Sequence, residues 1–335
     1  MSRTSSGLPA RSPPGWPRTR APRLPEGRHN QHRCRAATWL CRSRTVPVRS
    51  SAPAAPRAGL PLLSAAVNKL FAPDLFRDQV VTITGGGTGI GLSAARMFAE
   101  LGAKVAIGSR KQANVDAGLA ALREVAPDDR LYGATMDTRD TTLVEAWVDG
   151  VLGRFGQIDV LVNNAGGQFP SPAMNIVQKG WEAVIRNNLN GTWFMTHAVA
   201  TKAMIPAKRG RIVNVIAQVS RGFPGMAHTG AARAGVDNLT KSLAVEWAPF
   251  GIRVNAIAPG NNIQSSGTAQ YPAELFALAA KASPLRRVGT VDEVAQVIVF
   301  LSARELDFVT GDTWYVDGGQ KLWGDVWSVP DPSEV

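Results

Sequence analysis

The stretch Thr84-Gly85-Gly86-Gly87-Thr88-Gly89-Ile90-Gly91 decides the fold, because it joins a β-branched run over 80–84 to an amphipathic run over 90–101. A glycine-rich turn between a strand and a helix brings backbone N–H groups and a helix N-terminus to a phosphate. Its spacing, G-x-x-x-G-x-G, differs from the ordinary dinucleotide fingerprint, and a tight connection that binds nothing is the alternative. The position after a strand favours nucleotide binding. The residues predicted to bind are Gly85, Thr88, Gly89, Ile90 and Gly91.

Outward from this turn, β-branched runs alternate with amphipathic stretches. This alternation predicts a parallel sheet covered by helices on both faces. The predicted strands cover 80–84, 104–109, 131–136, 159–163, 211–216, 253–258 and 313–316, and predicted helices include 90–101, 142–155 and 236–248. No repeat or composition break divides this region. The predicted fold class is α/β: a single doubly wound, Rossmann-type domain over 71–325 with a seven-stranded parallel sheet.

The second predicted strand ends at Ser109-Arg110-Lys111. A doubly wound domain that binds NAD places an acid here, on the ribose 2′-hydroxyl. A small hydroxyl and two cations suit a 2′-phosphate instead, although a solvated charge pair at the start of a helix is the alternative. We therefore predict NADP(H) as the cofactor. Asp137, after the third strand, is predicted to accept a hydrogen bond from the adenine amino group, or else to cap a helix.

The charge of the chain is concentrated at its start. The formal net charge is +11 over 335 residues, but residues 1–60 hold 12 arginines and one acid, Glu26, while the rest holds equal numbers of basic and acidic residues. A nucleic-acid groove needs a basic face on the folded surface, so no nucleic-acid partner is predicted. Both cysteines, Cys34 and Cys41, fall in this first segment, which leaves the body no internal disulfide and no thiolate metal site. No apolar run is long enough to span a membrane.

The first segment is predicted to be disordered, because nine prolines interrupt residues 1–60 and no apolar spacing forms a helix or strand face. One interpretation of residues 1–70 is an Arg-rich transit peptide, which implies a mitochondrial or other organellar location. The other is a start placed too far upstream, with translation beginning at Val67 and a cytoplasmic enzyme. Residues 326–335 are predicted to form a C-terminal tail.

Several short motifs occur in order along the body. The fourth strand runs into Asn163-Asn164-Ala165-Gly166, and Asn188-Leu189-x-Gly191, Pro259-Gly260, Thr310-Gly311 and Asp317-Gly318-Gly319 follow. With the glycine-rich turn, this set resembles the short-chain dehydrogenase/reductase family over about residues 74–320. The resemblance implies an oxidoreductase that assembles as a homotetramer. It also implies further cofactor contacts at Asn164, Ala165, Gly166, Arg233, Pro259 and Gly260.

Two segments, 167–172 (GQFPSP) and 230–236 (GAARAGV), look most like the branch of peroxisomal trans-2-enoyl-CoA reductase and the 2,4-dienoyl-CoA reductases. The branch resemblance implies NADPH-dependent reduction of a carbon–carbon double bond conjugated to a thioester, with an acyl-CoA as substrate.

The family's usual catalytic set of Asn, Ser, Tyr and Lys is largely missing. None of the tyrosines, Tyr132, Tyr271 and Tyr315, is followed four residues later by a lysine. Aligned through the family motifs, the lysine position holds Arg233, the tyrosine position holds Thr229 and the serine position holds Ala217. Asn188 alone remains.

This loss bears on the chemistry. Reducing a ketone places charge on an oxygen that must take a proton as hydride arrives, and an aliphatic alcohol such as Thr229 cannot supply that proton. Conjugate hydride addition spreads the charge into an enolate, for which hydrogen-bond donors can be sufficient. The predicted catalytic residues are therefore Asn188, Thr229, Arg233 and His228, with Ser220 a second nearby donor. A loop histidine bonded to backbone is the alternative for His228.

Two other functions stay open. One is an alcohol or aldehyde oxidoreductase, for instance on terpenoid alcohols, in which His228 replaces the phenol. The other is a catalytically silent NADP-binding protein. Residues 264–281 are predicted to form the part that sets substrate specificity.

Overall fold

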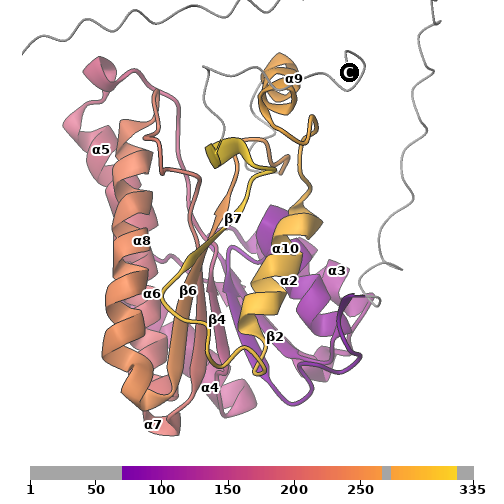
Figure 1. Cartoon of the computed structure of the whole chain (residues 1–335). Helices are drawn as coiled ribbons and strands as arrows, with labels where there is room; N and C mark the ends of the chain where they lie inside the picture. Colours follow the sequence, from indigo (N-terminus) through magenta and orange to yellow (C-terminus); the bar gives the residue numbers. More distant parts are fainter. Residues whose placement is uncertain (1–69, 266–272, 323–335) are drawn as a thin grey trace, which may run out of the picture. The chain divides into compact units, whose positions relative to one another are not determined.

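The computed structural model describes residues 70–265 and 273–322. Parallel strands and helices alternate through this region (Figure 1). The strands are β1 (Val80–Thr84), β2 (Lys104–Ser109), β3 (Leu131–Thr135), β4 (Val160–Asn163), β5 (Gly210–Val215), β6 (Ile252–Pro259) and β7 (Thr313–Val316). The longer helices are α2 (Gly89–Glu100), α3 (Gln112–Arg123), α4 (Thr141–Phe155), α5 (Gln178–Ile185), α6 (Gly191–Val199), α8 (Ala227–Trp247), α9 (Ala273–Ala282) and α10 (Val291–Ser302).

The strands form one seven-stranded sheet in the order β3-β2-β1-β4-β5-β6-β7. Every neighbouring pair is parallel. The chain moves outward from β1 in one direction through β2 and β3 and in the other from β4 to β7, so the order reverses between β1 and β4. The predicted doubly wound α/β fold is confirmed, and this reversal marks the place where such folds bind ligands.

Two apolar clusters hold the helices on the sheet. One face packs against α2, α3 and α10, with Phe98, Leu122 and Ile298 in the core. The other face packs against α4, α6 and α8, with Trp147, Met195 and Leu243 in the core. Because both faces are covered, the central strands carry apolar side chains on both sides, and all five residues of β1 are buried.

Most predicted boundaries fall within a residue of the observed ones, but one helix was predicted too short. The sequence predicted a helix over 236–248, whereas α8 begins at Ala227. Polar residues His228, Thr229 and Arg233 broke the apolar spacing, yet all three are buried on the helix face that carries Val236. The first turns of α8 therefore belong to the interior of the molecule.

Several predictions lie outside the described residues: the disordered or organelle-directing leader, Cys34, Cys41, Val67, Tyr271 and the tail over 326–335. Within the described part, no helix combines the length and apolar character that crossing a bilayer requires.

A line of buried amides and hydroxyls ties the centre of the sheet to two helices. Asn163 Nδ2 on β4 donates to Thr196 Oγ1 on α6 at 2.7 Å and to Asn214 Oδ1 on β5 at 2.9 Å. Asn214 Nδ2 in turn donates to Thr240 Oγ1 on α8 at 2.9 Å. All four side chains are less than 4% exposed, so each depends on the others for its hydrogen bonds.

Asn214→Ala should lower the free energy of unfolding by about 2–4 kcal/mol, because it removes two hydrogen bonds from the core, one from Asn163 Nδ2 and one to Thr240 Oγ1. Urea denaturation measures the change. Asn238→Ala, at an exposed position of α8, is the matched control and should change stability little. Equal stability of the two variants would show that this network contributes little to the free energy of unfolding.

Candidate active site

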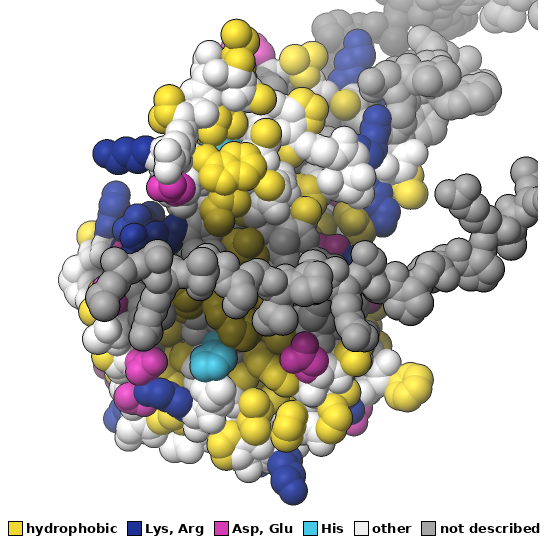
Figure 2. Space-filling model, turned by 90° about the vertical axis from the view of Figure 1, so that its left-hand side faces the viewer, with side chains coloured by type: hydrophobic (Ala, Val, Ile, Leu, Met, Phe, Trp, Pro, Cys, Tyr) yellow, Lys and Arg dark blue, Asp and Glu magenta, His cyan; other side chains and the backbone are white. Residues whose placement is uncertain are grey.

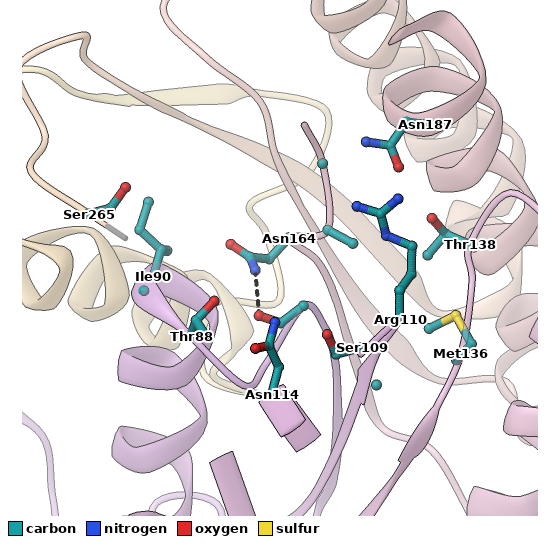
Figure 3. A pocket seen from close by; sticks show the side chains of 15 residues that line it. Thr88, Ile90, Ser109, Arg110, Asn114, Met136, Thr138, Asn164, Asn187 and Ser265 are labelled. Atoms are coloured by element: carbon teal, nitrogen blue, oxygen red, sulfur yellow. Dashed lines mark hydrogen bonds between the residues drawn. The ribbon is translucent and has the colours of Figure 1, made fainter. Parts of the chain in front are cut away.

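A cavity of about 260 Å³ opens at the carboxyl ends of β1, β2 and β4, at the reversal of strand order. Figure 3 shows side chains from the glycine-rich turn, the end of β2 and the segments after β3 and β4 converging on it. The predicted cofactor residues that line it are Gly85, Thr88, Gly89, Ile90, Ser109, Arg110, Asn164, Ala165 and Gly166. Their convergence makes this cavity the candidate cofactor site.

The turn after β1 is locked to the end of β4. Thr84 Oγ1 accepts hydrogen bonds from the backbone N–H groups of Asn164 and Ala165 at 3.0 and 2.9 Å. Asn164 Nδ2 donates back to the carbonyl oxygens of Thr84 and Gly85 at 3.0 and 3.2 Å (Figure 3). Gly91 packs so closely here that a Cβ would lie 2.4 Å from the Gly85 carbonyl oxygen. Only glycine allows this approach, so the start of α2 faces the cavity with bare backbone.

The end of β2 supplies the polar wall. Ser109 and Arg110 line the cavity beside Asn114 of α3, whereas Lys111 is an exposed residue at the N-terminal end of α3. Within residues 70–265 and 273–322, no carboxylate pairs with Arg110. The Arg110 guanidinium extends to the side of the cavity that Thr138 and Asn187 line (Figure 3).

Asp137 is engaged elsewhere. Its carboxylate accepts from Arg139 Nε at 2.9 Å and from Arg139 Nη2 at 2.6 Å, and the cavity is lined by its neighbours Met136 and Thr138. The hydrogen bonds from Arg139 hold the pKa of Asp137 below its ordinary value. The alternative prediction of a helix cap is wrong, since Asp140 caps α4 by accepting from the N–H groups of Thr142 and Leu143.

Three predicted residues meet at the far end of the site, beyond β4. A Cβ added to Gly166 would lie 2.2 Å from Arg233 Nη2 and 2.8 Å from Asn188 Oδ1. Asn188 exchanges hydrogen bonds with the Gly167 backbone, at 2.7 Å to its carbonyl and 3.2 Å from its N–H. A π-helical turn, η4 (Arg186–Asn190), presents Asn188 between α5 and α6. Asn188 therefore fixes the loop that carries Gly166.

Arg233 is a buried cation. Its side chain is 8% exposed, and Nη1 donates to the Val215 carbonyl oxygen at the end of β5 at 2.9 Å. No described carboxylate pairs with it. Burial lowers the pKa of Arg233 to about 10, below the ordinary value of an arginine. The guanidinium remains charged at neutral pH and puts positive potential at this end of the site.

His228 and Thr229 lie one turn before Arg233 on α8, and both are fully buried. The Thr229 N–H donates to His228 Nδ1 at 2.9 Å, so the neutral ring carries its proton on Nε2. Among the described residues, His228 Nε2 has no hydrogen-bond partner. Phe169 packs edge-on against the imidazole with ring centroids 4.6 Å apart. The structure thus leaves an unused donor next to the loop after β4.

No described tyrosine lines the cavity. Tyr132 packs near Trp147, and Tyr315 packs against the apolar cluster that holds Val236 and lies under Lys321, whose Nζ is 3.3 Å from the ring centroid. Ser220 is exposed and accepts from Gln218 Nε2 at 3.1 Å. Pro259 and Gly260 end β6 outside the cavity lining, with Gly260 packed against Asp317.

Sequence reasoning missed six lining residues: Gly108, Asn114, Met136, Thr138, Asn187 and Ser265. Asn187 is adjacent to the predicted Asn188, and Met136 and Thr138 flank the predicted Asp137. The sequence therefore placed these segments near the site but did not show which of their side chains face the cavity. Asn114 lies on α3, and no sequence motif marked it as a site residue.

Comparison with known proteins agrees with this geometry. The family model described as enoyl-(acyl carrier protein) reductase matches residues 85–321. The chain is 37% identical over 262 residues to the peroxisomal 2,4-dienoyl-CoA reductase of Pongo abelii, covering 77% of this chain and 88% of that protein. It is 38% identical over 242 residues to a 3-oxoacyl-(acyl-carrier-protein) reductase of Thermotoga maritima, covering 72% and 97%. A solved citronellol catabolism dehydrogenase of Pseudomonas aeruginosa PAO1 superposes with a TM-score of 0.67 at 39% identity, covering 75% and 98%.

The chain belongs to the short-chain dehydrogenase/reductase family. It is therefore an oxidoreductase that uses a nicotinamide cofactor, and this cavity is the candidate site for it. The bare backbone at Gly91 and the close approach of Gly166 to Arg233 fit such a group, because a dinucleotide needs backbone N–H groups at its pyrophosphate and hydrogen-bond donors at its ribose hydroxyls.

Gly166→Ala should weaken binding of the nicotinamide dinucleotide at least about tenfold, because the new methyl group displaces the Arg233 guanidinium. Fluorescence titration of the cofactor measures this. Gly153→Ala is the matched control, since a Cβ there meets nothing within 4 Å. Unchanged cofactor affinity in the Gly166 variant would show that Arg233 is not at the binding surface.

Proposed function

We propose that this protein reduces the carbon–carbon double bond of an α,β-unsaturated acyl thioester, such as a trans-2-enoyl-CoA or a dienoyl-CoA, with NADPH. The observation that carries the proposal is the meeting of Arg233 and Asn188 at Gly166, with the unpartnered Nε2–H of His228 on the same helix as Arg233 and against Phe169 of the loop after β4. These residues offer hydrogen-bond donors and positive charge, and no described tyrosine lines the cavity.

The preference for NADPH is supported by the wall formed by Ser109, Arg110 and Asn114. A 2′-phosphate on the adenosine ribose would find a cation and two neutral polar side chains there. A carboxylate at this place would favour NAD by accepting from the ribose hydroxyls, and it would repel the phosphate.

Arg233 and Asn188 have separate roles in this proposal. Asn188 is a positioning residue, because its amide is used on the Gly167 backbone and on the Val184 carbonyl oxygen, 2.9 Å away. Arg233 keeps one guanidinium nitrogen on Val215 and presents another to Gly166. It would hold the nicotinamide ribose and favour negative charge on the substrate.

Bound NADPH supplies a hydride. As hydride adds to the β-carbon of an enoyl thioester, or to the δ-carbon of a 2,4-dienoyl thioester, the π electrons would shift along the conjugated system to the thioester oxygen. His228 Nε2–H would donate a hydrogen bond to that oxygen, and the Thr229 N–H would keep the ring in the required tautomer. The α-carbon then takes a proton from water, which completes the reduction. A donor that stabilises an enolate is worth several kcal/mol in a site without bulk water.

Carbonyl chemistry is the second candidate, favoured by the likeness to the citronellol catabolism dehydrogenase. In that function His228 would have to deliver a proton to oxygen rather than a hydrogen bond. Its Nδ1 is occupied by the Thr229 N–H, so the ring cannot regain a proton through that atom while the bond persists. This contact favours the enolate role.

Assembly and location complete the proposal. Apolar side chains are spread over the face seen from the side of α5 and α8 (Figure 2), and Trp193 and Val245 are 37% and 77% exposed. These features support a homotetramer. We propose a cytoplasmic location, in line with the likeness to the bacterial reductase of Thermotoga maritima.

A substrate panel tests the function. With NADPH, trans-2-enoyl-CoA or 2,4-dienoyl-CoA should be reduced at least about tenfold faster than 3-oxoacyl-CoA or citronellal, because an oxo group requires proton delivery at oxygen. NADPH oxidation and mass analysis of the product measure this. Faster reduction of the oxo substrates would favour the second candidate, and cofactor binding without any turnover would favour a silent protein.

Ser109→Asp should shift the ratio of kcat/KM for NADPH over NADH toward NADH by at least about tenfold, because the carboxylate repels the 2′-phosphate. Arg110→Ala should weaken NADPH use and leave NADH use unchanged. A constant ratio in both variants would place the 2′-phosphate elsewhere.

His228→Ala should lower kcat for enoyl-CoA reduction about a hundredfold, as expected for loss of an oxyanion donor. His228→Gln should recover part of the rate, since its amide can donate at the same place. His197→Ala, at an exposed histidine of α6, is the matched control and should match the parent enzyme. A parental kcat in the His228→Ala variant would remove His228 from the mechanism.

A further inference from the structure

A second cavity lies at the opposite edge of the sheet, where the parallel strands begin. Its volume is about 360 Å³, within the lower range of about 300–1,000 Å³ that is usual for small-molecule sites. It is lined by Gln79, Asp159, Lys208, Arg209, Gly210, Arg211, Gly251, Arg253, Arg304 and Asp307. None of these residues belongs to the cofactor cavity.

The charges that line this cavity do not balance. Five basic side chains face two carboxylates. Asp159 contacts Arg209 and Arg304 at 3.1 and 3.4 Å, so one carboxylate serves two guanidinium groups. Asp307 contacts Arg211 and Arg253 at 2.9 and 3.3 Å in the same way. Lys208 pairs with no carboxylate in the described part of the chain, which leaves an excess of three positive charges.

The carboxylates are also used by other groups. Asp159 accepts from the Val80 N–H at 2.9 Å and from Gln157 Nε2 at 2.8 Å. It is 4% exposed and holds the start of β1 to β4. A carboxylate that shares its lone pairs among the backbone and two cations compensates each cation incompletely.

Arg211 forms the floor of the cavity. It is 8% exposed, and its terminal nitrogens donate to the carbonyl oxygens of Gly210 and Arg304 at 3.1 and 3.3 Å. Its Nε is buried, and no residue in the described part of the chain forms a hydrogen bond with it. Burial and the nearby cations Arg253 and Arg304 lower the pKa of Arg211, with Asp307 opposing them. Holding these like charges close together therefore costs free energy, and a bound anion would offset that cost.

The rim is adaptable. The side chains of Arg209 and Arg304 are 51% and 53% exposed, and exposed ion pairs of this kind contribute little stability. Both guanidinium groups can turn toward a ligand while Asp159 keeps its bonds to Val80 and Gln157. A flexible cationic rim over a fixed cationic floor suits an oxyanion with several acceptor oxygens.

We propose that this cavity is a binding site for a diphosphate group, either free or carried by a small ester such as adenosine diphosphate. The charge excess selects this class, because a diphosphate carries about three negative charges at neutral pH, whereas a monocarboxylate would leave most of the excess uncompensated. Arg211 and Arg253 form the inner contacts, and Lys208, Arg209 and Arg304 close over the outer phosphate.

Isothermal titration of the full chain with pyrophosphate, in the presence of saturating NADP⁺ to fill the cofactor cavity, tests the proposal. Saturable binding at one site per chain with a Kd below about 1 mM is expected, together with a rise in melting temperature. The same titration with adenosine diphosphate separates a nucleotide from a free diphosphate. Acetate at equal ionic strength should show no saturable binding.

The double variant Lys208→Gln, Arg209→Gln should weaken pyrophosphate binding at least about tenfold and keep the fold, since both side chains are exposed. The matched control is the double variant Lys179→Gln, Arg186→Gln, at exposed positions of α5 and of the turn η4. This variant should bind pyrophosphate as the parent does. Arg253→Gln provides a test at the inner contacts and should also weaken binding. Absence of saturable binding, or equal affinity in the parent and the cavity variants, would overturn the proposal.

Discussion

The joint between Thr84 and Asn164 is the constraint on which the rest of the active site depends. The hydroxyl of Thr84 accepts two backbone N–H groups from the end of β4, and the amide of Asn164 returns two hydrogen bonds to the glycine-rich turn. These bonds cross the point where the strand order reverses. They hold the turn and the Gly166 loop at one distance, so the cavity between them has a fixed floor.

The active site is built around a cation that the interior does not neutralise. Arg233 is buried beside Gly166 and bonds only to a carbonyl oxygen among the described residues. A buried charge without a counter-ion is costly, and proteins keep one where a ligand supplies the opposite charge or where charge develops during a reaction. The unpartnered Nε2 of His228 on the preceding turn has the same explanation. In the proposed reaction, both groups would face the negative charge that develops on the substrate.

The two edges of the sheet use different physical means to attract anions. At the carboxyl edge, backbone N–H groups at the start of α2 and a single buried guanidinium would serve a dinucleotide. At the amino edge, long cationic side chains line the second cavity and would take that role in the proposed diphosphate site.

The sequence by itself determined the order of strands and helices, the doubly wound class and the residues of the glycine-rich turn, because these follow from local periodicity and from the backbone freedom of glycine. It also showed that the usual phenol was missing from its motif. The tertiary structure decided what each polar side chain does: Asp137 turns to Arg139 while Met136 and Thr138 line the cavity, and Asn114 arrives from another helix. Only the folded chain brings Arg211, Arg253 and Arg304 together, since residues far apart in sequence meet where parallel strands begin. The direction of a side chain and its contacts with residues far away in the sequence depend on tertiary packing. Local sequence patterns do not contain that information.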